Sequence, residues 1–121
     1  DNVMVEGVLP SQLVMPRVDL AVTMGGQGSV QCAMAAGTPL VAVPLHPEQD
    51  LNVSLIERLG AGHRIAMADA VSPRLGAHVR RVMEQPTYRA AAGRIAAAYS
   101  RVDGPGMAAD AILSSLTEHR P

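Results

Sequence analysis

Short apolar runs alternate with helical segments in the first half of the chain, and this alternation limits the possible fold more than any other feature. Leu20-Ala21-Val22 lies within a strand candidate at 19–23, and residues 40–43 form a continuous apolar run. Such a run is typical of a strand that is covered on both faces. Residues 29–36 have helical composition, and Gly37 follows where a glycine commonly ends a helix. Strand, helix and strand with short connections predict an α/β fold, with a Rossmann-like parallel sheet flanked by helices.

Weaker signals on either side of this unit predict further elements. Val3-Met4-Val5 predicts a short strand, and Ser11 predicts the cap of a brief helix that Pro16 stops. Four apolar residues then recur at helical spacing: Leu51, Leu55, Ile56 and Leu59. Gly60 is expected to end that helix, and Arg64-Ile65 suggests one more strand. Only three or four strands are predicted, which is a small sheet for this architecture.

The second half of the chain reads as helical, and we expect helices at about 73–117 to close the domain. Ser72-Pro73 and Pro86 are each placed to begin a helix. A break is predicted at 103–106, followed by a short helix over 108–116. These helices are expected to pack on the sheet or to reach a neighbouring domain or chain.

Composition excludes several classes of partner. The chain has 121 residues, so we expect one domain over 1–121, and its net charge is −1. A near-neutral balance argues against nucleic acid or an anionic membrane as the main partner. No apolar run reaches the roughly 20 residues of a membrane span, and no export signal is visible. We therefore expect a cytoplasmic location.

Cysteine and aromatic residues are scarce. Cys32 is the single cysteine, which excludes an intrachain disulfide and a cysteine-rich zinc site. Phe and Trp are absent, so a core must be built from Ala, Val, Leu, Ile and Met. We expect no metal and no separate cofactor. The chain begins with Asp1 rather than Met, and we read it as a piece of a longer protein.

The stretch Met24-Gly25-Gly26-Gln27-Gly28-Ser29 carries the clearest functional signal. It follows a predicted strand and opens a predicted helix. Glycines allow close approach of a ligand to the backbone, and a helix N-terminus offers free N–H groups to a phosphate or diphosphate. The stretch is neither a P-loop nor the GxGxxG dinucleotide fingerprint. The alternative is a tight strand–helix turn that needs glycine only for its shape.

Several motifs agree in order with one family. Gly25-Gly26-Gln27-Gly28-Ser29 is followed by Gly37-Thr38-Pro39, then by Glu48-Gln49 and Asn52, and then by Leu59-Gly60-Ala61-Gly62. This series resembles the C-terminal, donor-binding domain of GT-B glycosyltransferases. The similarity is greatest to the UDP-glycosyltransferase group, which includes the antibiotic and macrolide glycosyltransferases. The resemblance covers nearly the whole chain.

The resemblance implies a set of donor contacts: Gly25, Gly26, Gly28 and Ser29 for the diphosphate, Leu9 for the base, and Glu48 and Gln49 for the sugar hydroxyls. The carboxylate and the amide also suit vicinal hydroxyls by their own chemistry. The alternative for both is a solvated first turn of a helix. Asn52 is interpreted as a structural helix residue.

Three positions depart from the family pattern. The phosphate-binding histidine of the family is Met24 here, the base-stacking aromatic is Val8, and the ribose-binding acid is Cys32. Methionine cannot donate a hydrogen bond. A second hypothesis is therefore a degenerate, non-catalytic binding or interaction module derived from a glycosyltransferase. A third, a related nucleotide-sugar epimerase, has no acid–base cluster to support it.

The resemblance implies a parent enzyme that moves a sugar from a UDP- or dTDP-type donor to a small acceptor with inversion. The catalytic histidine and the acceptor site of the family lie in an N-terminal domain, so we expect no catalytic residue in this chain and no transferase activity from it alone. We expect the chain to bind a nucleotide-sugar donor, to associate with the acceptor domain or with a second chain, and to self-associate. His46 reads as an exposed loop histidine, whereas His63, His78 and His119 have no acid at a suggestive spacing.

Overall fold

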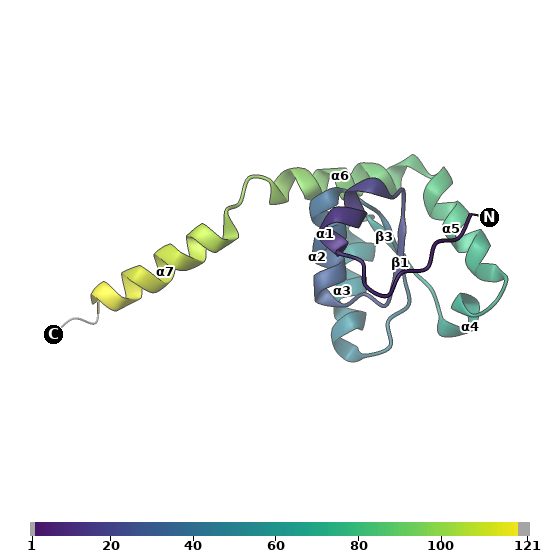
Figure 1. Ribbon diagram of the computed structural model, residues 1–121, viewed down its shortest axis with the longest axis horizontal. Helices are drawn as coiled ribbons and strands as arrows, with labels where there is room; N and C mark the ends of the chain where they lie inside the picture. The colour runs from purple at the N-terminus through teal and green to yellow at the C-terminus, as the bar shows by residue number, and fades with distance from the viewer. Residues whose placement is uncertain (1, 119–121) are drawn as a thin grey trace.

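The computed structural model describes residues 2–118 and shows a parallel sheet flanked by helices (Figure 1). Its three strands are β1 (Ala21–Thr23), β2 (Leu40–Ala42) and β3 (Gly62–Arg64), in the order β1-β2-β3. Val22 pairs with Val41, and Val41 pairs with His63. The predicted α/β class is therefore confirmed. Three strands are at the lower end of the expected number.

Helices connect and follow the strands. They are α1 (Ser11–Val14), the 3₁₀ turn η1 (Met15–Arg17), α2 (Gln27–Ala36), α3 (Pro47–Arg58), α4 (Met67–Ala70), α5 (Arg74–Glu84), α6 (Pro86–Tyr99) and α7 (Gly104–Glu118). Gly37 closes α2 with a φ of +71°, and Gly60 follows α3 with a φ of +77°. Both glycines stand where the sequence predicted the helix ends, in a left-handed conformation that other residues rarely adopt.

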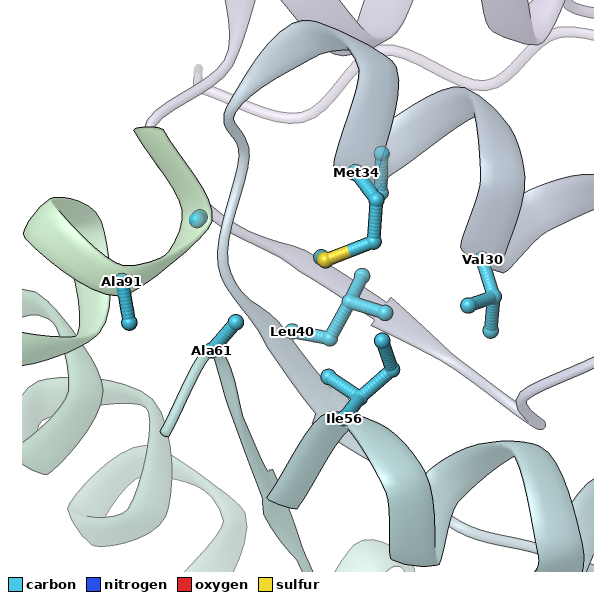
Figure 2. Packing of buried hydrophobic residues seen from close by; sticks show 8 residues of the cluster. Val30, Met34, Leu40, Ile56, Ala61 and Ala91 are labelled. Atoms are coloured by element: carbon cyan, nitrogen blue, oxygen red, sulfur yellow. The ribbon is translucent and has the colours of Figure 1, made fainter. Parts of the chain in front are cut away.

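One face of the sheet packs against α2, α3 and α6. Figure 2 shows Met34 of α2, Leu40 of β2 and Ile56 of α3 pointing toward one another. Small residues complete this cluster where α6 approaches, among them Ala61 and Ala91. Alanines therefore let the helices lie close to the sheet in a core without aromatic side chains.

The opposite face of the sheet packs against α5. Val41 is fully buried there, next to Ile65 and Val82. Leu40 and Val41 are neighbours in β2 but belong to different clusters, as alternation along a strand requires. The continuous apolar run of β2 is thus explained by burial on both faces.

The predicted strand at Val3-Met4-Val5 is wrong. Residues 2–9 have no helix or strand, and these three side chains are 74–88% exposed. A strand needs a neighbour for its backbone hydrogen bonds, and the described chain pairs none with this segment. The predicted strand at Arg64-Ile65 lies two residues earlier, at Gly62–Arg64.

The C-terminal helices differ from the predictions in their bounds. The N-cap residue of α5 is Pro73 rather than the predicted Ser72, and Ser72 Oγ accepts a hydrogen bond from the Arg74 N–H at 3.2 Å. Asp103 Oδ1 accepts from the Gly106 N–H at 3.0 Å. The glycines predicted as a break therefore form the first turn of a 15-residue helix, α7, which projects away from the rest of the molecule (Figure 1). The short α4 was not predicted.

Across residues 2–118, none of the helices combines the length and the apolar character needed to cross a bilayer. The predicted domain extent of 1–121 and the cytoplasmic location remain predictions.

Candidate functional site

The loop that follows β1 is held in one shape by Gly25. Gly25 is buried and has a φ of +84°. A Cβ atom at this position would lie 2.3 Å from Cγ2 of Val53 in α3. Its N–H donates to Thr23 Oγ1 at 3.3 Å. Glycine is therefore required here both by conformation and by the close approach of α3.

Helix α2 begins at Gln27, two residues before the predicted start at Ser29, so Gly28 lies in its first turn rather than before it. Gly26 is the N-cap residue and provides no side chain to cap the helix. Within residues 2–118, no hydrogen bond is formed by the backbone N–H groups of Gln27, Gly28 and Ser29. A Cβ at Gly26 or Gly28 would meet no atom within 4 Å. The loop thus presents three free donors and the positive end of the helix dipole in an open position.

Asn52 of α3 connects the glycine loop to the predicted sugar-binding pair. Its Nδ2 donates to the Gly25 carbonyl at 3.1 Å and to Glu48 Oε1 at 2.7 Å. These contacts are those of a structural residue, as the sequence interpretation had it, and they join two predicted site residues. Sequence spacing carries part of this signal, since residues 48 and 52 share one helix face.

Gln49 and Glu48 stand in the first turn of α3, after β2. The Gln49 Oε1 accepts a hydrogen bond from the Leu45 N–H at 2.9 Å, which fixes the side chain against the loop and leaves its NH₂ group for other acceptors. The side chain of Glu48 is exposed, and one of its oxygens accepts from Asn52. Parallel strands end on one edge of the sheet, so the loops after β1 and β2 meet there. The arrangement combines backbone N–H groups that can bind an anion with a carboxylate and an amide.

The positions predicted to contact the base are not joined to this loop. Val8 and Leu9 are 90% and 56% exposed, and within residues 2–118 no hydrogen bond links residues 2–9 to the glycine loop. Met24 is 52% exposed beside Gly25. Cys32 is half-buried and lines a separate, mostly apolar hollow of about 370 Å³.

A chain of three polar residues begins at β3 and continues onto the neighbouring helices. The sequence interpretation did not identify it. His63 Nε2 and His78 Nδ1 are 3.0 Å apart, and His78 Nε2 lies 3.4 Å from Asp69 Oδ2. The three come from β3, α4 and α5, so their separations along the sequence gave little sign of contact. The sequence showed no acid at a suggestive spacing, and in the structure packing brings Asp69 to His78. His119 lies outside the described residues.

The pKa of His63 is lowered, first by burial and then by the charges of Arg81 and His78, while Glu57 opposes the shift. The unfolded chain therefore takes up a proton at a higher pH than the folded chain. We expect the contribution of His63 to stability to be complete above pH 6.5 and to fall as the pH drops below 6.5.

Urea unfolding at pH 7.5 and at lower pH measures this effect. The loss of stability on acidification should be smaller in His63→Gln than in the unmodified chain. His46→Gln, in an exposed loop, is the matched control and should leave the loss unchanged. An equal loss in the His63→Gln and unmodified chains would contradict the assignment.

Within residues 2–118, no three His, Cys, Asp or Glu side chains are grouped so as to hold a metal ion.

Comparison with known proteins defines the class of protein. By its fold, the chain is a C-terminal α/β domain of the GT-B glycosyltransferase class. The profile of the family described as "Erythromycin biosynthesis protein CIII-like, C-terminal domain" matches residues 1–111, and the chain belongs to this family. The resemblance stated from the sequence motifs is thus confirmed.

Individual relatives agree with this assignment. Demethyllactenocin mycarosyltransferase of Streptomyces fradiae is 31% identical over 117 residues, which are 97% of this chain and 25% of the relative. The crystal structure of the kitacinnamycin glycosyltransferase superposes with a TM-score of 0.85 at 29% identity, over 93% of this chain and 29% of that one. The Streptomyces sp. SF2575 glycosyltransferase SsfS6, complexed with thymidine diphosphate, gives 0.69 at 27% identity, over 79% and 25%. The chain therefore spans about a quarter of the length of these proteins.

Proposed function

We propose that the chain binds the nucleotide-sugar donor of a glycosyltransferase at the loop between β1 and α2. The three free N–H groups of Gln27, Gly28 and Ser29 carry this proposal, because they form an open anion site at a helix N-terminus. In the proposed complex, they hold the donor diphosphate, Gly25 and Gly26 shape the turn, and Leu9 faces the base. A donor of the UDP or dTDP type is supported by the thymidine diphosphate bound in the SsfS6 structure.

The sugar is assigned to the first turn of α3. The Gln49 NH₂ group and the free oxygen of Glu48 offer a donor and an acceptor to its hydroxyls. In the whole enzyme, this sugar passes with inversion to a small acceptor. We assign the catalytic base and the acceptor site to residues outside this chain, which alone should be inactive. No metal or separate cofactor is assigned. Association through the open edge of β1, where Val22 is 49% exposed, also remains a prediction.

A second candidate is a non-catalytic binding or interaction module. The specific observation in its favour is Met24, an exposed side chain at the loop that cannot donate a hydrogen bond. Val8 and Cys32 also favour it, because Val8 replaces the base-stacking aromatic of the family and Cys32 replaces its ribose-binding acid.

Titration of the chain with thymidine diphosphate and UDP, followed by backbone NMR, tests the proposal. We expect saturable shifts at Gly26, Gly28 and Ser29. Met24→His should add a hydrogen bond to the diphosphate and tighten binding about tenfold to a hundredfold, because a hydrogen bond to a charged group contributes roughly 1.5–3 kcal/mol.

The matched control is Met67→His, which introduces the same residue at another exposed methionine after β3. It should leave the affinity unchanged. If neither nucleotide bound the folded chain at millimolar concentration, the proposal would be contradicted and the interaction module favoured. Binding that Met24→His leaves unchanged would contradict the assigned position of the diphosphate.

A further inference from the structure

A polar hollow lies at the start of β3, between the end of α3 and the helices α5 and α6. Its volume is about 480 Å³. Its lining includes His63 of β3, Arg81 of α5 and, from α6, Tyr88 and Arg94. It shares no residue with the glycine loop, and the proposed donor function makes no use of it.

The charges that line this hollow are not balanced. Within residues 2–118, neither Arg81 nor Arg94 is paired with a carboxylate. Glu57 is the one acidic residue of the lining, and Arg64 engages it. Glu57 Oε1 accepts from the Arg64 backbone N–H at 3.2 Å, and Oε2 lies 3.9 Å from Arg64 Nε. Two guanidinium groups therefore share a polar hollow without an acidic partner.

His63 can add a third positive charge. If His78 Nε2 donates to Asp69, His78 Nδ1 must accept the hydrogen bond from His63 Nε2. This arrangement leaves His63 Nδ1 as a lone pair that can take a proton. The titratable or charged groups around His63 are Glu57 of α3, Asp69 of α4, His78 and Arg81 of α5, and Arg94 of α6, together with Arg64 beside it in β3.

Several carbonyls at the ends of the neighbouring helices already have backbone donors. At the end of α3, the carbonyls of Leu55, Ile56 and Glu57 accept backbone hydrogen bonds from Leu59, Ala61 and Gly60, respectively. At the end of α5, the Arg81 carbonyl accepts from the Gln85 N–H at 3.2 Å. These carbonyls already have donors, so the arginines are not needed to satisfy them.

We propose that this hollow is a second anion site, which binds the phosphate group of a small molecule between Arg81, Arg94 and His63. Guanidinium groups suit phosphate oxygens because they donate two parallel hydrogen bonds. Tyr88 and Thr87 add hydroxyl groups to the lining. Inorganic phosphate and a phosphate monoester share this chemistry, and the volume admits either.

Titration of the full chain with inorganic phosphate, followed by NMR, tests the proposal, and a parallel titration with glycerol phosphate distinguishes free phosphate from a monoester. We expect saturable shifts at Gly62, His63 and Tyr88, and a rise in the pKa of the His63 ring when phosphate is bound, because an adjacent anion favours the charged ring. The double variant Arg81→Gln/Arg94→Gln should weaken binding by about tenfold or more.

The matched control is Arg80→Gln/Arg101→Gln, which removes the same charge from two exposed arginines outside the hollow. It should leave phosphate binding unchanged. An equal loss in both double variants, or an unchanged pKa of His63 at saturation, would overturn the proposal. Shifts confined to Gly26, Gly28 and Ser29 would overturn it while leaving the donor site supported. Circular dichroism establishes that each variant is folded.

Discussion

Replacing Gly25 with alanine is expected to destabilise the chain by about 2–5 kcal/mol. Two effects add. A left-handed backbone costs an alanine about 1–2 kcal/mol, and the new methyl group would lie 2.3 Å from Cγ2 of Val53. Val53 is itself buried, at 3% exposure, so its side chain has little space into which it can move. Urea unfolding monitored by circular dichroism measures the change.

Gly26→Ala is the control for this prediction. It adds the same methyl group to the adjacent residue, where φ is −60° and no atom lies within 4 Å. Because Gly26 is the N-cap of α2, where alanine is disfavoured, its effect on stability should stay within about 1 kcal/mol. If the two variants were equally stable, the Gly25 turn would not be the fixed element that shapes the proposed diphosphate site.

Replacing Leu40 with alanine is expected to cost about 2–5 kcal/mol, because it leaves a cavity in the cluster shown in Figure 2. Leu40 is 1% exposed and lies between Met34 and Ile56. The remaining neighbours include alanines, which cannot reach into the space. The free energy of unfolding from urea titration gives the value.

Leu51→Ala makes the same change on the exposed side of α3, where the side chain is 61% exposed. It should change stability by no more than about 0.5 kcal/mol. A Leu40→Ala variant as stable as Leu51→Ala would contradict the view that this face of the sheet holds the fold together.

The fold was predictable where a short sequence pattern has one common structural explanation. Gly37 and Gly60 marked helix ends because a left-handed turn needs glycine. The apolar run of β2 marked a central strand because both of its faces are covered. Val3-Met4-Val5 misled because three apolar residues satisfy a strand pattern without specifying a partner strand.

The candidate site also has a part that the sequence predicted and a part that it did not. The glycine loop could be predicted because its chemistry is local to one turn. The link from Asn52 to Gly25 spans 27 residues, and the contact of His63 with His78 joins a strand to a helix. Such contacts arise from packing, so sequence spacing predicts only that Asn52 can reach Glu48. The roles of Leu9, Glu48 and Gln49 remain predictions.

The projecting helix α7 has a consequence for how the molecule unfolds. Its described side chains, through Thr117, are exposed except at Gly106, including Ile112 and Leu116. A 15-residue helix without tertiary packing is marginal in water, because propagation hardly offsets nucleation. Its amide protons should exchange with solvent well before those of β2, as an independent cooperative unit. The helicity of α7 and the integrity of the sheet are therefore two separate quantities in this chain, and melting of α7 does not report unfolding of the sheet.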